Sequence, residues 1–195
     1  MSANAVTLAR LPLLILIVSL LYRPAVVPQQ VAAFLIIALI VMDSFDGWLA
    51  RRQGECSVLG SVLDIAMDRL VEFVLWVVFA DLDMIPIIIP LVVLSRGVVV
   101  DAMRSMAPAK GLRPFDMVHT DLSRFLVGSP WMRTSFAVVK AAAFFLLGLA
   151  LSMQTGGHAA ALTTRSIASG VAWLALGFCL ARGLPVLIEA PQVLR

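Results

Sequence analysis

Long apolar runs alternate with short polar segments along most of this chain. A helix needs about 20 mostly apolar residues to cross a bilayer, and all but the first of the runs reach about that length. The six runs cover residues 8–22, 29–50, 57–80, 84–105, 132–153 and 166–188. The pattern therefore predicts an all-α integral membrane protein with six transmembrane helices.

The polar segments between these runs add two smaller elements. Residues 2–7 precede the first span and are expected to cap its helix or to form a short N-terminal interfacial segment. Residues 107–130 form the only long loop, and we expect a short interfacial helix within it. Its apolar residues recur at helical spacing: Met117, Val118, Leu122, Phe125 and Leu126. No internal repeat or low-complexity tract divides the chain, so residues 1–195 are predicted to be a single domain.

Two details of the spans follow from individual residues. Proline is tolerated at the start of a helix, so Pro86 and Pro90 are expected in the first turns of the fourth span. Tryptophan is enriched at membrane interfaces. We therefore expect interfacial or lipid-facing positions for the four tryptophans: Trp48, Trp76, Trp131 and Trp173.

Composition supports a membrane class and argues against other partners. The chain is 61% hydrophobic and 14% charged, with a mean hydropathy of +0.99, whereas soluble domains carry about 25% charged residues. The net charge of +3 does not indicate nucleic-acid binding, because no basic run with interleaved aromatic residues occurs. The two cysteines are far apart and suggest no disulfide framework.

The basic residues of the loops predict the orientation in the membrane. Positive residues concentrate in cytoplasmic loops. Most of them fall at the start of the first span or in the loops after the second and fourth spans: Arg10, Arg51, Arg52, Lys110, Arg113 and Arg124. We therefore expect a multi-pass protein of the inner, or cytoplasmic, membrane with both termini in the cytoplasm.

Four aspartates gather where the second span ends and the third begins. Asp43 and Asp46 share one face of the second helix, and Asp64 and Asp68 lie four residues apart on the third, with Glu72 one turn deeper. Unpaired carboxylates at membrane depth would cost several kcal/mol each. They must be protonated or bind metal, and hard oxygen ligands suit Mg²⁺ or Mn²⁺.

Small residues flank these acids. Gly47, Ala50 and Gly60 would let a flat base and a diphosphate approach the backbone closely. The same residues also suit tight helix packing in lipid, and both roles remain open. The site predicted from the residues alone is therefore a metal-assisted one at the cytoplasmic side of the membrane.

The segment as a whole resembles the signature of the CDP-alcohol phosphatidyltransferase family. That signature reads D-x-x-D-G-x-x-A-R, eight residues, and then G-x-x-x-D-x-x-x-D. Every fixed position is present: Asp43, Asp46, Gly47, Ala50, Arg51, Gly60, Asp64 and Asp68. The six-span layout is also similar, so the resemblance reaches most of the chain.

The resemblance implies an activity and a set of roles. The activity is transfer of a phosphatidyl group from CDP-diacylglycerol to a small alcohol, with release of CMP, in phospholipid biosynthesis. Asp43, Asp46, Asp64 and Asp68 would share two metal ions, and Asp68 would accept the proton of the attacking hydroxyl. The sequence leaves open whether Asp68 is ligand, base or both. The resemblance also implies a homodimer. The CDP group would be bound at Asp43, Asp46, Gly47, Ala50, Arg51, Ser57 and Gly60.

The later spans carry cations that point to the acceptor. Arg96 and Arg104 lie about 12 Å apart along the fourth helix, and Arg133 and Lys140 lie two turns apart on the fifth. Guanidinium groups pair well with phosphate, so we expect these four residues to bind a phosphorylated acceptor. Alternatively, Asp101 or Glu72 would neutralise Arg96.

The identity of the acceptor rests on weaker resemblances. The stretch from Ser95 to Ala107 is similar to bacterial phosphatidylglycerophosphate synthases, so glycerol 3-phosphate is the first expectation. The pair Asp68-Arg69 with Glu72 is closer to relatives that accept inositol phosphate. Serine or another lipid head-group alcohol remains a further alternative. A divalent-cation transporter or a membrane scaffold would be functions of a different class.

Overall fold

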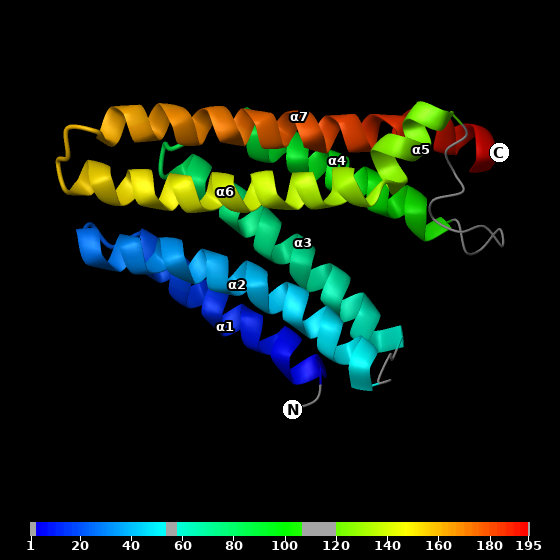
Figure 1. Ribbon diagram of the computed structural model, residues 1–195, viewed down its shortest axis with the longest axis horizontal. Helices are drawn as coiled ribbons and strands as arrows, with labels where there is room; N and C mark the ends of the chain where they lie inside the picture. The colour runs from blue at the N-terminus through cyan, green and yellow to red at the C-terminus, as the bar shows by residue number, and fades with distance from the viewer. Residues whose placement is uncertain (1–2, 54–57, 107–119, 195) are drawn as a thin grey trace.

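The protein is all-helical in the part that the structure describes. The computed structural model describes residues 3–53, 58–106 and 120–194, with side chains for 9–42, 60, 62–106 and 120–189. These residues form seven helices and no strand (Figure 1). The helices are α1 (Ala3–Leu21), α2 (Val26–Gln53), α3 (Val58–Asp81), α4 (Ile88–Met106), α5 (Asp121–Gly128), α6 (Pro130–Thr155) and α7 (Ala161–Leu194).

Each of the six predicted spans coincides with one long helix, although the boundaries differ. The largest differences are in α7, which covers 161–194 where the sequence predicts 166–188. Residues 3–7 are the first turns of α1 rather than a separate segment, because no helix-breaking residue stands between them and the span. Pro86 precedes α4 instead of lying in its first turn, whereas Pro90 is the third residue of the helix. The helix expected within 107–130 is α5, and residues 107–119 lie outside the described part.

The apolar character of the helices is uneven. Two helical stretches, Pro130–Thr155 and Ala161–Glu189, are long and apolar enough to cross a membrane, and Ala9–Leu21 and Val26–Met42 are shorter apolar stretches. Charged side chains interrupt α3 and α4. These charges lower the mean hydropathy of α3 and α4, so the described residues of the two helices do not meet the length and composition criteria for a membrane span. Several of the charged residues belong to the site described below.

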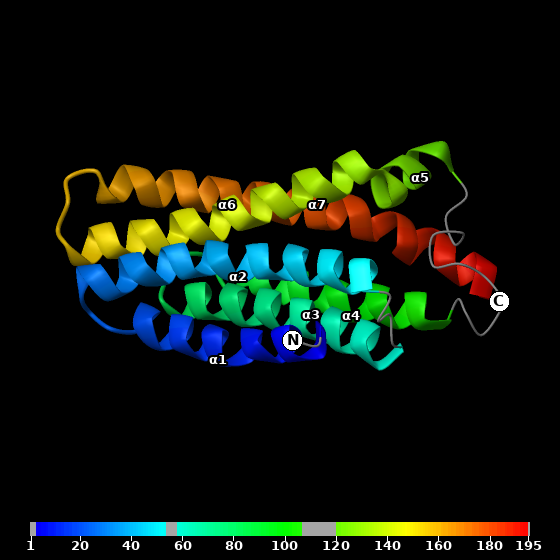
Figure 2. The same cartoon turned by 60° about the horizontal axis from the view of Figure 1, so that its bottom comes forward.

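The six long helices form an elongated bundle (Figure 1). Helix α6 packs antiparallel to α7, α2 packs against α1 and α6, and α4 packs against α3 and α7 (Figures 1 and 2). The described connections 22–25, 82–87 and 156–160 lie together at the left of Figure 1, so α1 and α3 begin, and α2, α4 and α7 end, toward the opposite side of the bundle. The first turns of α3 and the last turns of α2 therefore meet at that end.

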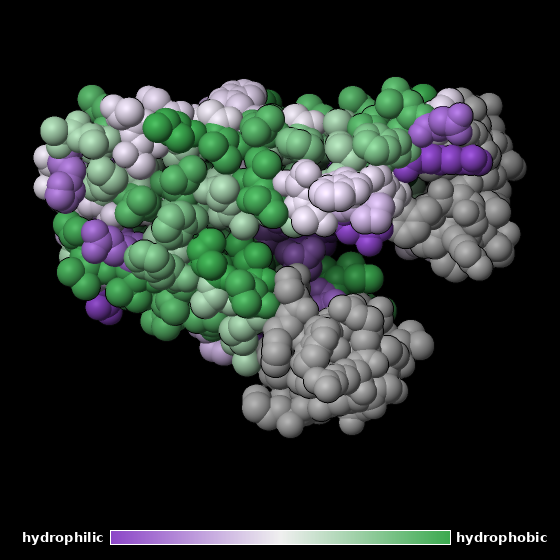
Figure 3. Space-filling model, in the orientation of Figure 1, coloured by the Kyte–Doolittle hydropathy of each residue, from purple (hydrophilic) through white to green (hydrophobic). Residues whose placement is uncertain are grey.

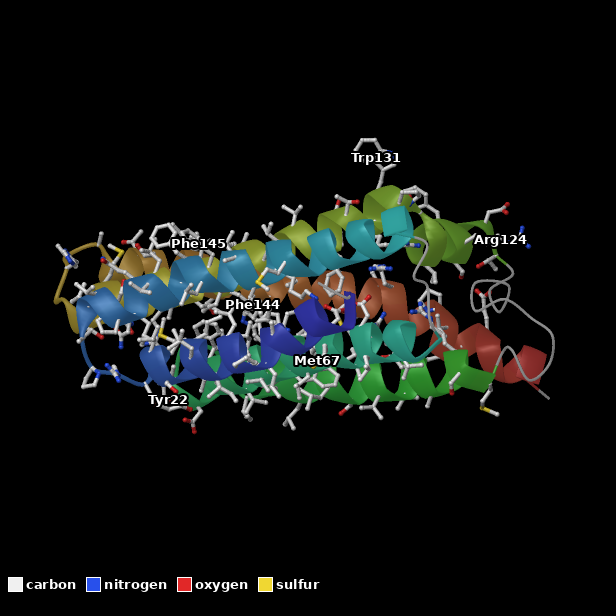
Figure 4. All side chains as sticks on the ribbon, turned by 90° about the horizontal axis from the view of Figure 1, so that it is seen from below. Tyr22, Met67, Arg124, Trp131, Phe144 and Phe145 are labelled. Carbon is white, nitrogen blue, oxygen red and sulfur yellow. The ribbon has the colours of Figure 1, made fainter. Side chains whose placement is uncertain are left out.

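Aromatic residues fill the middle of the bundle. The ring of Trp76 lies 4.6 Å from that of Phe144, and Phe144 sits between the helices in Figure 4. Trp76 is only 1% exposed, so its predicted interfacial or lipid-facing position is wrong: an aromatic ring in a span gains more contacts inside the bundle. Trp131 projects outward, as Figure 4 shows, and Trp173 is also exposed. The side chain of Trp48 lies outside the described part.

Small residues and one hydrogen bond fix how the helices meet. An added Cβ at Gly148 of α6 would lie 3.0 Å from the Cβ of Ala33 on α2, so these helices approach as closely as small residues allow. Toward the same end of the bundle, the Tyr22 hydroxyl donates a hydrogen bond to Asp81. That bond ties the end of α1 to the end of α3.

Candidate active site

Three acids occupy one face of α3. Asp64, Asp68 and Glu72 are spaced four residues apart on a continuous helix, so they lie on successive turns of the same face. The stripe runs from the end of the bundle where α2 meets α3 toward its middle. Asp68 and Glu72 line an internal cavity, and Glu72 is only 3% exposed.

Asp64 has a buried oxygen without a hydrogen-bond partner. This oxygen, Oδ1, makes no hydrogen bond within the described residues, and Nη1 of Arg10 lies 3.8 Å away. Arg10 comes from α1 and is itself 1% exposed. The Asp64 side chain as a whole is 45% exposed, and a carboxylate oxygen that makes no hydrogen bond suits a metal cation, since hard oxygen ligands bind Mg²⁺ and Mn²⁺.

The other predicted residues of the motif lie at the end of α2 or beyond it. The backbones of Asp43, Asp46, Gly47, Ala50 and Arg51 belong to the last turns of α2, but their side chains are outside the described part. Ser57 is outside it altogether, and Gly60 lies in the first turn of α3. Among the described side chains, no three His, Cys, Asp or Glu residues form a metal site, and two of the four predicted ligands are not among them.

The cavity beside Asp68 is strongly basic. It has a volume of about 340 Å³ and takes residues from six helices. Seven basic and two acidic side chains line it, which leaves an excess of five positive charges. Figure 3 shows hydrophilic residues inside a recess of a mostly hydrophobic face. The basic lining residues are Arg10, Arg69, Arg96, Arg104, Arg133, Lys140 and Arg182.

Internal acids neutralise only part of this charge. Arg69 makes a two-point contact with Asp101, with Nε–Oδ2 and Nη2–Oδ1 distances of 2.6 and 2.9 Å. Glu72 Oε2 accepts from Lys140 Nζ at 3.1 Å and from Arg69 Nη1 at 3.4 Å. Neither Asp101 nor Glu72 forms an ion pair with Arg96 among the described residues, since these acids contact Arg69 and Lys140 instead.

Arg96 on α4 and Arg182 on α7 are two of the cavity arginines whose Nε atom is buried and makes no hydrogen bond within the described residues. The Arg182 guanidinium stacks over the Phe136 ring at 5.7 Å, and Lys140 approaches the same ring at 5.5 Å. Buried guanidinium groups without an acid partner suit an anionic ligand.

All four residues predicted to bind the acceptor phosphate line this one cavity with Asp68: Arg96, Arg104, Arg133 and Lys140. Sequence reasoning missed three of its basic residues, Arg10, Arg69 and Arg182. Arg10 was interpreted only as a charge that sets orientation. A signal for Arg10 and Arg182 was present, because an arginine within an apolar span usually faces a cavity or a partner.

Comparisons with known proteins agree with the motif. The model of the CDP-alcohol phosphatidyltransferase family matches residues 1–181. The chain is also 35% identical over 85 residues to an archaetidylinositol phosphate synthase of Aeropyrum pernix. That alignment covers 43% of this chain and 43% of the relative, so it spans less than half of either protein. The match over nearly the whole chain confirms the enzyme class predicted from the motif, and this protein belongs to the CDP-alcohol phosphatidyltransferase family.

Proposed function

We propose that this protein transfers a phosphatidyl group from CDP-diacylglycerol to a phosphorylated alcohol and releases CMP. The observation that carries the proposal is the single cavity that holds the Asp68 carboxylate together with Arg96 and Arg182, whose buried Nε atoms make no hydrogen bond among the described residues. A carboxylate and an anion-binding cluster in one cavity can orient a phosphorylated alcohol with its hydroxyl toward the base.

The reaction is a direct displacement at phosphorus. Asp68 takes the proton from the acceptor hydroxyl, because an alcohol is a weak nucleophile near neutral pH. The acceptor oxygen bonds to the phosphorus nearest the lipid, and the bond from that phosphorus to CMP breaks. The arginines hold the acceptor phosphate on the opposite side of the cavity from the reacting hydroxyl.

Divalent metal fits the acids of this site. Asp64 offers a buried oxygen that makes no hydrogen bond among the described residues, and Asp68 lies one turn along the same face of α3. We propose that these two residues, with Asp43 and Asp46 of α2, hold two Mg²⁺ or Mn²⁺ ions. When bound, such ions neutralise the charge on the diphosphate and on the leaving CMP. The rest of the motif, Gly47, Ala50, Arg51, Ser57 and Gly60, is proposed to contact the CDP group.

The charge of the cavity favours a phosphorylated acceptor over a neutral one. Basic side chains outnumber acidic ones in the cavity even when Asp101 beside Arg69 and Asp64 beside Arg10 are counted. Such an excess of positive charge is expensive to bury unless an anion compensates it, and serine has no phosphate to do so. Glycerol 3-phosphate and inositol phosphate both meet this requirement. The similarity to an archaetidylinositol phosphate synthase favours inositol phosphate, so we propose it ahead of glycerol 3-phosphate.

The wider setting is proposed from the sequence and the family. The six long helices would cross the inner membrane, with both termini and the active site on the cytoplasmic side. The chain would act as one domain and as a homodimer. In Figure 1, α1 begins and α7 ends on the side of the bundle away from the three described connections at the left, and this arrangement supports the proposed topology.

An acceptor panel tests the proposed function. Purified protein would be incubated with CDP-diacylglycerol, Mg²⁺ and one alcohol at a time, and CMP release would be measured. We expect release with inositol phosphate or glycerol 3-phosphate and little with inositol, glycerol or serine. Turnover of the unphosphorylated alcohols alone would refute the role of the basic cavity. Absence of CMP release with every acceptor would instead favour the transporter alternative.

The role of Asp68 is tested separately. Asp68→Asn keeps the shape of the side chain but removes its ability to accept the proton. With Mg²⁺ at saturation we expect kcat to fall by roughly 10²–10⁴-fold with a smaller change in KM for the acceptor. Turnover near that of the wild type would exclude Asp68 as the base.

A further inference from the structure

Gly183 on α7 lies directly beneath the side chain of Arg96 on α4. A Cβ atom added at Gly183 would lie 2.1 Å from Nε of Arg96, 2.8 Å from Cγ and 2.9 Å from Cδ. Real Cβ atoms essentially never approach another heavy atom closer than 3.0 Å. The stem of Arg96 therefore crosses the α7 backbone at the one residue type that leaves room for it.

The close approach of the Arg96 side chain to Gly183 fixes the position of the Arg96 guanidinium. The three clashing atoms belong to the middle of the side chain rather than to its tip, so they cannot move without moving the guanidinium. Arg96 lines the basic cavity, and its buried Nε makes no hydrogen bond with the described residues. No acid among the described side chains forms an ion pair with Arg96, so packing against α7 fixes its path.

The crowding is specific to this position on α7. Added Cβ atoms at Gly170 and Gly177 of the same helix would meet nothing within 4 Å. Gly183 also follows Arg182, whose guanidinium lines the same cavity. The adjacent pair therefore contributes one cation directly and leaves space for a second cation from α4.

We propose that Gly183 is a positioning residue for recognition of the acceptor phosphate, because its missing side chain lets Arg96 reach the cavity. The inference rests on the proposed function, in which that cavity binds a phosphorylated alcohol. A side chain at position 183 displaces the Arg96 stem and removes its guanidinium from the phosphate.

The primary test compares Gly183→Ala with Gly177→Ala. Both add one methyl group to a glycine of α7, but only the first meets Arg96. For Gly183→Ala we expect KM for the phosphorylated acceptor to rise about tenfold or more, the effect of losing one charge-assisted hydrogen bond. We expect kcat and KM for CDP-diacylglycerol to change less than about threefold, well under one such bond, and Gly177→Ala to resemble the wild type.

A double variant shows whether the effect passes through Arg96. Arg96→Ala removes the clashing stem, so adding Gly183→Ala to it should raise KM no further. If Gly183→Ala alone fails to fold, the double variant should fold, since the space is then free. The proposal is overturned if Gly183→Ala raises KM equally in both backgrounds, leaves KM unchanged, or lowers kcat alone.

Binding of inorganic phosphate separates this inference from the proposed function. Thermal stabilisation by phosphate needs no turnover and follows the occupancy of the cavity. We expect phosphate to stabilise the wild type and Gly177→Ala but to stabilise Gly183→Ala much less. Equal stabilisation of all three would overturn the role of Gly183 whatever the acceptor panel shows. No stabilisation of any of them, together with no CMP release, would overturn both proposals.

Discussion

At the scale of single residues, the site is defined by which cations have an acid partner and which do not. Arg69 and Lys140 are held by Asp101 and Glu72, so they stabilise the bundle. Arg96 and Arg182 have buried nitrogens that make no hydrogen bond among the described residues. The latter arginines are therefore the ones we expect to bind a ligand most directly.

Loss of Arg182 should weaken acceptor binding. Arg182→Gln keeps most of the stem but removes the charge, and we expect KM for the phosphorylated acceptor to rise roughly 10- to 100-fold. The matched control is Arg165→Gln at the other end of α7, where Arg165 donates to the Asp83 carbonyl. Steady-state CMP release measures both variants. Equal effects of the two substitutions would contradict a specific role for Arg182.

Loss of Glu72 should destabilise the fold. This carboxylate is 3% exposed and contacts both Lys140 and Arg69, so Glu72→Gln leaves buried positive charge uncompensated. We expect the free energy of unfolding in detergent to fall by about 2–4 kcal/mol. Adding Lys140→Gln should recover part of the lost stability, because it removes a cation that is paired with Glu72 in the wild type. A double variant less stable than Glu72→Gln would contradict this explanation.

At the scale of elements, the first turn of α5 is held against α7 by hydrogen bonds to one carboxylate. The N-terminus of α5 is capped by Thr120, and Glu189 near the end of α7 accepts hydrogen bonds from the Thr120 amide at 3.4 Å and hydroxyl at 2.8 Å. The Ser123 hydroxyl also donates to Glu189. One carboxylate thus holds the first turn of α5 against α7, and its charge is favourable at a helix N-terminus.

Removal of that carboxylate should loosen α5. In Glu189→Ala we expect the amides of residues 121–128 to exchange with solvent at least about tenfold faster, since two or more hydrogen bonds are lost. Ser166→Ala is the control, because the Ser166 hydroxyl bonds only within its own helix, to the Leu162 carbonyl. Hydrogen exchange followed by mass spectrometry reports both. Unchanged exchange in Glu189→Ala would show that α5 is held by its apolar contacts alone.

The elements were largely predictable from the sequence, whereas their packing was not. Long apolar runs predicted the six long helices because membrane spans have a fixed minimum length, although α7 extends five and six residues beyond the two ends of its run. The runs did not reveal that Trp76 faces inward, since residues that face lipid and residues that face the interior are both apolar. Nor did they show that Arg10 of α1 reaches the cavity. Charged residues inside the runs were the reliable signal for the site.

At the scale of the whole molecule, the bundle brings distant segments to one cavity. Acids from α3 and cations from α1, α4, α6 and α7 meet there, although they span most of the chain. The family signature predicts the acidic half of the site because it is compact in sequence, and the structure describes the side chains of two of its acids, Asp64 and Asp68. The basic half is dispersed over several helices, so only its members within apolar spans could be inferred before the helices were placed in space.

The most direct test of this account is a structure of the protein with Mg²⁺ and inositol phosphate or glycerol 3-phosphate bound. We expect the phosphate of the acceptor within hydrogen-bond distance of Arg96 and Arg182, and a hydroxyl of the same molecule facing Asp68. Acceptor density at any other place on the protein, or in the cavity with its phosphate turned toward Asp68 and away from those arginines, would contradict it.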